Sequence, residues 1–210
     1  MALDHRGADV TAKTMCSDGD ALRGGVDVHG LTAEEADECH SCLFGQGSGE
    51  RVLTTTLCTD VVDSTATASR IGDAAWRDLI AEQTSATRRE IDRYRGHEAA
   101  TTGDGLLALF DGAERAIHCG AAIHRASDAL GVQLRIGIHT GEVERMTDNV
   151  RGVAVHLVTR VTALAEPGQV LISDVTHELV AETALRFETL GDHELKGISR
   201  PVGVWQLVAE

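Results

Sequence analysis

ATTGDGLLALF, residues 100–110, places a β-branched run before Gly103-Asp104-Gly105 and an apolar run after it. Glycines around a polar residue supply the backbone freedom of a tight turn, so the stretch predicts a β-hairpin. The hairpin would hold Asp104 at a strand end. A carboxylate there, with glycines that let other groups approach, suits a Mg²⁺ ion shared with substrate phosphates. Hairpin chemistry alone also explains the turn, so a site needs a second acid.

The second acid lies upstream. Residues 52–59 (VLTTTLCT) are β-branched and apolar, which is typical of a buried strand, and they run directly into Asp60. Apolar residues between Ile71 and Tyr94 then recur at roughly helical spacing. Two interpretations of the intervening Ser64 and Thr65 stay open. Their hydroxyls and the nearby N–H groups suit phosphate oxygens, or the two residues are simple helix N-caps.

The order of the following elements predicts the fold. Small residues on one face indicate a helix over residues 113–124, and strict alternation indicates a half-buried strand over 132–141. Strand, helix, strand, strand, helix, strand is the ferredoxin-like split βαβ core (βαββαβ) of the α+β class. This arrangement puts Asp60 and Asp104 at neighbouring strand ends. The polar residues 142–150 are expected to protrude as an arm.

The C-terminal part predicts a helix and strands added to this core. A helix is expected over residues 152–165, and within it His156 and Arg160 are four residues apart and share a face. Such a pair suits a bound anion, although Arg160 alone also fits an ordinary surface arginine. Further elements are predicted at residues 170–173 (strand), 175–180 (helix), 187–190 (strand, ending in a turn at Gly191) and 202–208 (strand).

Composition excludes several classes of protein. The 210 residues suffice for one good-sized domain and a tail. With 33 acidic residues against 19 Lys and Arg, the formal charge of -14 argues against a nucleic-acid surface. No apolar run approaches the roughly 20 residues that cross a bilayer, and the five scattered cysteines fit reduced thiols. We therefore expect a soluble, cytoplasmic protein with neither membrane nor nucleic acid as partner.

Residues 1–50 lack sustained periodicity and are expected to form a loosely ordered tail. Within the tail, Cys39 and Cys42 have the Cys-x2-Cys spacing of half a zinc site, for which Cys16, His29 and His40 are available partners. Unpaired thiols in a flexible leader are the simpler interpretation.

Seven motifs then occur in order: TDVVDST, GDAAW, TTGDG, RIGIHTGEV, RGVAVHLVTR, PGQVLIS and LGDHELKG. By these motifs residues 51–208 resemble the catalytic domain of the class III nucleotidyl cyclases, in particular the adenylate cyclases of actinobacteria. The resemblance implies a catalytic domain over residues 51–210 that converts ATP to 3′,5′-cyclic AMP and pyrophosphate. It adds an expected function to the fold that the pattern predicts.

The resemblance also implies a metal site. In that family two aspartates, here Asp60 and Asp104, hold two divalent cations (Mg²⁺ or Mn²⁺), with the Val61 carbonyl as a further ligand. One ion activates the ribose 3′-hydroxyl and the other neutralises charge on the triphosphate. Arg160 matches the arginine that stabilises charge on the α-phosphate, and His156 stands where many members carry an asparagine that orients the ribose.

Phosphate-binding positions would be Asp63, Ser64 and Thr65 at the start of the first helix, together with Arg160. The family site is composite: the aspartates come from one subunit and the arginine helix from the other. A homodimer with two equivalent sites is therefore implied, with residues 142–150 at the contact and little activity in a monomer.

The chain departs from the family pattern where the base is selected. Adenylate cyclases usually carry a lysine at the position of Ala100 and an aspartate at that of Asn149. Alanine offers no hydrogen bond to the base, whereas Asn149 can accept one and the Val150 backbone can contact the ring. ATP with weakened selectivity is the prediction, and GTP stays open. Cys58 replaces a common phenylalanine, which should affect packing only.

Three interpretations remain open. The chain is an active cyclase, or it is a degenerate cyclase-homology domain that binds nucleotide and regulates a partner. In the third interpretation, the cysteine segment of the tail is a metal-bound interaction module. A diguanylate cyclase would share the split βαβ fold, but its Gly-Gly-Asp-Glu-Phe signature is absent from the sequence.

Overall fold

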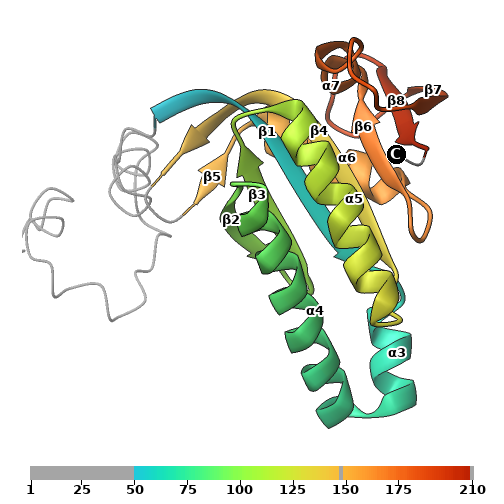
Figure 1. Cartoon of the computed structure of the whole chain (residues 1–210). Helices are drawn as coiled ribbons and strands as arrows, with labels where there is room; N and C mark the ends of the chain where they lie inside the picture. Colours follow the sequence, from blue (N-terminus) through green and yellow to red (C-terminus); the bar gives the residue numbers. More distant parts are fainter. Residues whose placement is uncertain (1–49, 147–148, 209–210) are drawn as a thin grey trace, which may run out of the picture. The chain divides into compact units, whose positions relative to one another are not determined.

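The computed structural model describes residues 50–146 and 149–208 (Figure 1). The predictions for residues 1–49, including those for Cys39 and Cys42, lie outside the described residues. The elements follow one another as β1 (Glu50–Val61), α3 (Ser64–Ile71), α4 (Asp73–Arg93), β2 (His97–Thr102), β3 (Gly105–Phe110), α5 (Ala113–Ala129), β4 (Leu134–Arg145), β5 (Val150–Arg151), α6 (Val153–Leu164), β6 (Val170–Ser173), α7 (Asp174–Leu179), β7 (Phe187–His193) and β8 (Val202–Leu207).

Over this described part of the chain, eight strands form one sheet. Seven of them lie in the order β2-β3-β1-β4-β6-β8-β7, and the short β5 pairs with β4. β1 runs antiparallel to both β3 and β4, whereas β4 and β6 are parallel. The first four strands with their helices are the predicted βαββαβ core of the α+β class. The added helices and strands at the C-terminus are confirmed as well.

Alternating strand side chains divide the sheet into two faces. One face carries Leu57 and Ile136, which pack with Ile117 of α5 in a cluster that α4 also covers. The opposite face carries Cys58, which packs with Val158 of α6. Figure 1 shows α4 and α5 on the near side of the sheet. α6 is therefore the helix that covers the second face of the central strands.

The hairpin predicted from residues 100–110 is confirmed. β2 and β3 pair antiparallel up to Thr102 and Gly105, so only Gly103 and Asp104 form the turn. Gly103 has φ +71°, a left-handed backbone that glycine adopts without a steric penalty. The local turn chemistry therefore holds Asp104 at the tip between two strands.

The start of the first helical segment differs from expectation. Asp63 is the N-cap residue, with a left-handed φ of 51° and no side-chain capping bond, and Ser64 is already helical. The interpretation of Ser64 and Thr65 as N-caps is therefore wrong. The sharp left-handed turn just after β1 moves the helix start one residue earlier than the hydroxyls suggest. Gly72, at φ 86°, then separates α3 from α4.

Two other segments also differ. Residues 142–145, predicted as part of a protruding arm, continue β4 and pair with residues 50–53 of β1. β5 adds to this extension through the pair Arg145–Val150. Gly191 does not end a strand in a turn: β7 continues to His193, with a register shift between Thr189 and Gly191. Backbone pairing with a neighbouring strand outweighs the local polar and glycine signals at both places.

Among the helices described, none combines the length and apolar character that a membrane span requires.

Candidate functional site

The two predicted metal-binding aspartates lie at the same end of adjacent strands. β1 and β3 pair antiparallel as far as Cys58 and Leu107. Beyond that pair, the backbone N–H of Leu106 donates a 3.0 Å hydrogen bond to the Thr59 hydroxyl. Asp60 directly follows Thr59, and Asp104 lies two residues before Leu106. The hairpin and the long strand therefore bring both carboxylates to one edge of the sheet.

Arg135 is a charged neighbour of Asp60 that the sequence patterns did not identify. The β1–β4 register sets the two residues opposite each other. Arg135 Nη1 donates to Asp60 Oδ2 at 3.3 Å, with side chains 33% and 46% exposed respectively. In the sequence, Arg135 stands out as the charged residue inside the alternating run LRIGIHTG. Only the pairing register of β1 and β4 shows that Arg135 lies next to Asp60.

The donor set at this edge fits a Mg²⁺ or Mn²⁺ ion that is shared with a ligand. Within residues 50–146 and 149–208, no group of three or more His, Cys, Asp or Glu side chains is arranged to hold a metal by itself. Two carboxylates with the backbone carbonyl of Val61, which ends β1, offer only oxygen atoms. Mg²⁺ is usually bound by one or two carboxylates plus substrate phosphates. The site therefore suits a cation that arrives together with a polyphosphate.

Helix α6 presents His156 and Arg160 to the outside. Ala154, Val158 and Val161 are buried against the sheet, while His156 and Arg160 are both exposed. The spacing prediction that these two side chains share a face is confirmed. They point away from the sheet face on which α6 lies, so the fold of one chain does not turn them inward.

A glycine explains how closely α6 lies on the sheet. A Cβ atom at Gly137 of β4 would stand 2.4 Å from Thr162 Oγ1 and 2.6 Å from the Thr162 backbone nitrogen. The Thr162 hydroxyl also donates to the Val158 carbonyl within α6 at 2.8 Å. Thr162 of α6 therefore lies directly against the Gly137 backbone, and any side chain at position 137 would push the helix away from the sheet. The outward direction of His156 and Arg160 is therefore built into the packing.

Three of the four predicted phosphate positions, Asp63, Ser64 and Thr65, lie at the start of α3, shortly after the end of β1, and the fourth, Arg160, is on α6. Asp63 and Thr65 are exposed and Ser64 is half-buried. The Asp63 carbonyl accepts from the Thr67 N–H at 2.8 Å, which closes the first turn. The first N–H groups of this helix thus begin close in sequence to Asp60.

The predicted base-binding positions pack on one apolar cluster. Val150 is 5% exposed and belongs to the cluster that contains Cys58 and lies beneath α6, and the half-buried Ala100 packs against the same cluster. Asn149 is exposed, and its Oδ1 accepts from the Val150 N–H at 2.8 Å. The structure therefore brings Ala100 and Val150 to the same cluster, whereas the Asn149 amide oxygen is bonded to the backbone of its own neighbour.

A buried polar network stiffens the neighbouring strands. His139 Nδ1 and the Ser173 hydroxyl are 2.7 Å apart, and that hydroxyl is 3.1 Å from Thr176 Oγ1. Burial lowers the pKa of His139 to about 4; Asp174 opposes this shift and Arg200 adds to it. His139 is therefore neutral at pH 7. It connects β4 to β6 and α7 and has no direct role at the carboxylates.

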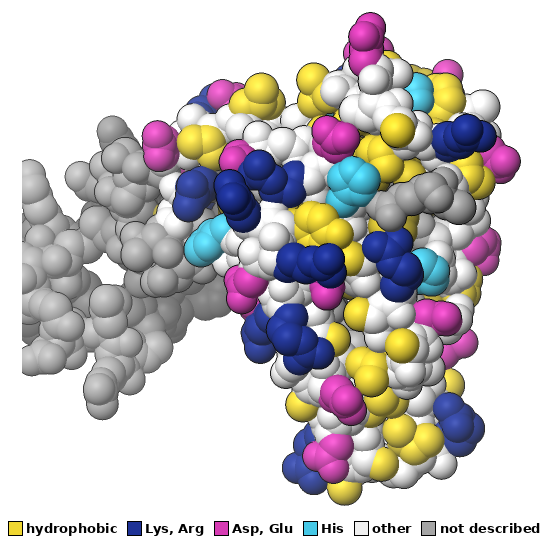
Figure 2. All heavy atoms as spheres, in the orientation of Figure 1, with side chains coloured by type: hydrophobic (Ala, Val, Ile, Leu, Met, Phe, Trp, Pro, Cys, Tyr) yellow, Lys and Arg dark blue, Asp and Glu magenta, His cyan; other side chains and the backbone are white. Residues whose placement is uncertain are grey.

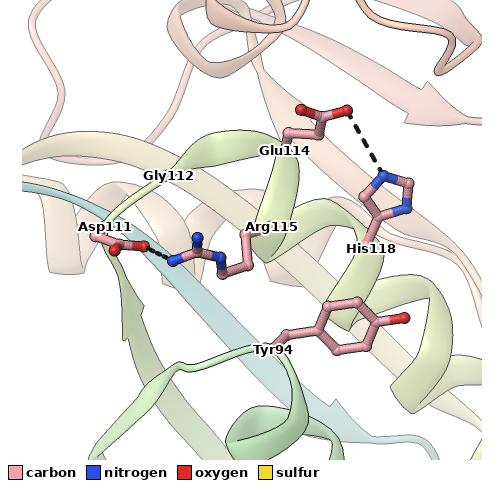
Figure 3. A pocket seen from close by; sticks show the side chains of 6 residues that line it. All are labelled: Tyr94, Asp111, Gly112, Glu114, Arg115 and His118. Carbon is pink, nitrogen blue, oxygen red and sulfur yellow. Dashed lines mark hydrogen bonds and ion pairs between the residues drawn. The ribbon is translucent and has the colours of Figure 1, made fainter.

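A hollow of about 420 Å³ lies elsewhere on the described surface, at the end of β3 that is remote from Asp104. Figure 3 shows its walls, where Arg115 forms an ion pair with Asp111 and His118 faces Glu114 at 3.8 Å. None of the predicted site residues lines this hollow.

Lys and Arg side chains are interspersed with acidic and apolar ones on the face drawn in Figure 2.

Comparison with known families agrees with this geometry. Residues 50–209 match the family described as the adenylate and guanylate cyclase catalytic domain. The chain belongs to this cyclase family. The matched residues include the sheet edge with Asp60 and Asp104 and the helix with Arg160. The expectation of a class III nucleotidyl cyclase domain is thus confirmed.

Curated relatives match about half of this chain. The chain is 36% identical over 121 residues to "Putative adenylate cyclase 3" of Rhizobium meliloti, covering 53% of this chain and 21% of that protein. It is 37% identical over 108 residues to an uncharacterized protein of Mycobacterium tuberculosis, covering 50% of this chain and 38% of that one. The chain therefore spans well under half the length of these relatives.

Solved structures share the fold. The adenylate/guanylate cyclase/hydrolase of Silicibacter pomeroyi superposes with a TM-score of 0.70 at 29% identity, covering 77% of this chain and 99% of that one. The guanylyl cyclase Cya2 gives 0.68 at 26% identity, covering 76% and 93%. The adenylyl cyclase CyaB of P. aeruginosa gives 0.71 at 24% identity, covering 77% and 96%, which shows the fold alone.

Proposed function

We propose that this chain is an adenylate cyclase that converts ATP to 3′,5′-cyclic AMP and pyrophosphate at the interface of a homodimer. The observation that carries the proposal is the pair Asp60 and Asp104 at one end of adjacent strands, in a domain of the cyclase family. The proposed setting is the cytoplasm, where ATP is available and where the free, buried thiols of Cys58 and Cys119 stay reduced.

Asp60, Asp104 and the Val61 carbonyl would hold two divalent cations, Mg²⁺ or Mn²⁺. When bound, such ions lower the pKa of a hydroxyl group and neutralise phosphate charge. The chain's own part is to keep both carboxylates at the sheet edge. The turn at Gly103 and the Thr59–Leu106 hydrogen bond do so without relying on long flexible side chains.

The reaction needs one bond to form and one to break. The ribose 3′-oxygen forms a bond to the α-phosphorus and gives its proton to solvent, while the bond to the β-phosphate oxygen breaks and pyrophosphate leaves with the electron pair. Arg160 would stabilise the negative charge on the α-phosphate through its planar guanidinium. His156 would donate a hydrogen bond to the ribose. Asp63, Ser64 and Thr65 would surround the phosphates at the first turn of α3.

The dimer is proposed because two of the proposed site residues face outward on a single chain. His156 and Arg160 are exposed on the side of α6 that faces away from the sheet, and the opposite side of the helix packs closely on Gly137 of β4 through Thr162. A second copy related by a two-fold axis would supply these side chains to the aspartates of the first. Each dimer would then have two equivalent sites, with residues 142–150 contributing to the contact.

The choice between ATP and GTP depends on the base pocket. Ala100 has no hydrogen-bonding side chain and packs on an apolar cluster, so the base lacks one directed contact. The Asn149 amide oxygen, which already accepts from the Val150 N–H, would accept a second hydrogen bond from the adenine amino group. We propose ATP as the preferred substrate, with selectivity over GTP weakened by the missing contact. Ala100→Lys should then change the ratio of kcat/KM for ATP and GTP.

The decisive experiment is a product assay of the purified chain with Mn²⁺ and either ATP or GTP. Cyclic AMP should form, and Asp104→Ala should abolish it. Asp111→Ala is the matched control, because Asp111 follows the remote end of the same strand. An equal loss in both variants, or no product from either nucleotide, would contradict the proposal.

A mixing experiment tests the composite site. Asp104→Ala and Arg160→Ala should each be inactive alone, whereas an exchanged mixture contains heterodimers with one intact site. Random exchange restores roughly a quarter of the wild-type activity. A mixture that stays inactive after exchange has been demonstrated would mean that both residues act within one chain.

Ala100 also favours a second candidate, a degenerate cyclase-homology domain that binds nucleotide and regulates a partner. Its signature would be nucleotide binding that depends on Asp60 and Asp104 without any cyclic product. The product assay with a parallel equilibrium-binding measurement separates the two functions.

A further inference from the structure

Asp60 already has a cationic partner in this chain. Arg135 Nη1 lies 3.3 Å from Asp60 Oδ2, and the two residues are directly opposite each other on β1 and β4. The pairing strands run continuously through this point, from Glu50–Arg145 to Val61–Leu134. The backbone ladder therefore fixes the two side chains near each other.

The ion pair with Asp60 is the main interaction that offsets the cost of partly burying the Arg135 guanidinium. Its Nε atom is buried, and within the described residues it has no hydrogen-bond partner. No other acidic side chain among residues 50–146 and 149–208 forms an ion pair with this guanidinium. An arginine whose Nε is desolvated and unpaired depends on the remaining contacts for its stabilisation. Asp60 supplies the ion pair.

The second aspartate differs. In the same described part of the chain, Asp104 forms no ion pair, and its half-buried carboxylate lies on the glycine turn. Within the described residues, Asp60 thus has an arginine as its ion-pair partner, whereas Asp104 has none. A cation that approaches this edge meets one open carboxylate and one that is already occupied.

We propose that Arg135 is the resting counter-ion of Asp60 and competes with divalent cations for this carboxylate while no nucleotide is bound. The proposal rests on the proposed function, in which Asp60 is a metal ligand. A divalent cation at Asp60 must displace the guanidinium or tolerate its repulsion at short range. A polyphosphate brings the negative charge that offsets this repulsion. Arg135 thereby couples metal binding to nucleotide binding and acts as a positioning residue through Asp60.

The test measures Mn²⁺ binding to the nucleotide-free full chain by electron paramagnetic resonance of free Mn²⁺. Arg135→Gln removes the competing charge and keeps a polar side chain. Arg135→Gln removes a half-exposed ion pair with Asp60 and the repulsion between the guanidinium and the cation. Both changes favour Mn²⁺ binding, so the Mn²⁺ Kd should be roughly three- to tenfold lower. Arg89→Gln, an exposed position on α4 that loses the same charge, is the matched control and should leave the Kd within about twofold of wild type.

Two further variants test whether the effect on Mn²⁺ binding depends on the charge of Arg135 and acts through Asp60. Arg135→Lys keeps the charge on a less directional side chain and should give an intermediate Kd. Adding Asp60→Asn to Arg135→Gln should remove the gain in affinity. Circular dichroism and thermal melting of each variant establish that the fold is kept, so a change in Kd reports the site.

The outcomes separate the two proposals. If Arg135→Gln and Arg89→Gln leave the Mn²⁺ Kd equally unchanged while wild type still makes cyclic nucleotide, the counter-ion role is overturned and the proposed function stands. If Arg135→Gln tightens Mn²⁺ binding through Asp60 but wild type makes no cyclic product, the counter-ion role stands and the cyclase activity does not. Equal tightening in the Arg89 control would also overturn the proposal, because it would indicate a general charge effect.

Discussion

His139 should make the folded chain sensitive to mild acid. Its pKa is about 4 in the folded protein against an ordinary 6.5, chiefly because burial disfavours the charged ring. The unfolded chain therefore takes up the proton first as the pH falls. This contribution to stability is complete above about pH 6.5 and is progressively lost as the pH falls toward 4. At about pH 5 the loss is about 2 kcal/mol, and at pH 4 and below it approaches about 3 kcal/mol.

The measurement is urea unfolding followed by circular dichroism between about pH 7.5 and pH 4.5, for wild type and His139→Asn. Asparagine lowers stability at neutral pH because the hydrogen bond to Ser173 changes, but it removes the proton uptake. The difference between the two unfolding free energies should therefore shrink by about 2 kcal/mol on going to pH 5. His97→Asn, at an exposed position of β2, is the control. Parallel pH profiles for wild type and His139→Asn would refute the reasoning.

Three further predictions concern the parts that support the site. Gly137→Ala should destabilise the fold by about 1 to 3 kcal/mol in urea unfolding and lower kcat, because the new methyl group would collide with the Thr162 backbone of α6. Gly103→Ala should cost about 1 kcal/mol because of its left-handed φ and should raise the Mn²⁺ concentration needed for half-maximal activity; an unchanged metal requirement would mean that the turn does not position the carboxylate. Glu98→Gln should cost under about 1 kcal/mol in thermal melting, since its two-pronged ion pair with Arg88 is partly exposed to solvent.

Much of the core could be predicted because its signals are local. The turn at Gly103 and the alternation of the strand at residues 134–141 each reflect contacts between neighbours in sequence. Once those elements were ordered as strand, helix, strand, strand, helix, strand, the split βαβ topology brought Asp60 and Asp104 to one edge. The spacing of His156 and Arg160 likewise required only the helical repeat.

Other features required the folded chain. The strand identity of residues 142–145 depends on pairing with β1, because their own polar composition favours a loop. The outward direction of Arg160 depends on the close seat of α6 on Gly137, a contact between residues 25 positions apart along the chain. Sequence patterns indicate which face of an element is apolar, but they do not say what covers it.

The sequence by itself determined the class of fold, the hairpin and the identity of the acidic pair, because turn geometry and hydrophobic periodicity act over a few residues. Only the tertiary structure decided that Arg135 faces Asp60, since strand register is set by the whole ladder of pairs between β1 and β4. A shift of one residue would have turned either side chain to the opposite face of the sheet. The charge balance at the candidate metal site is therefore a property of the register.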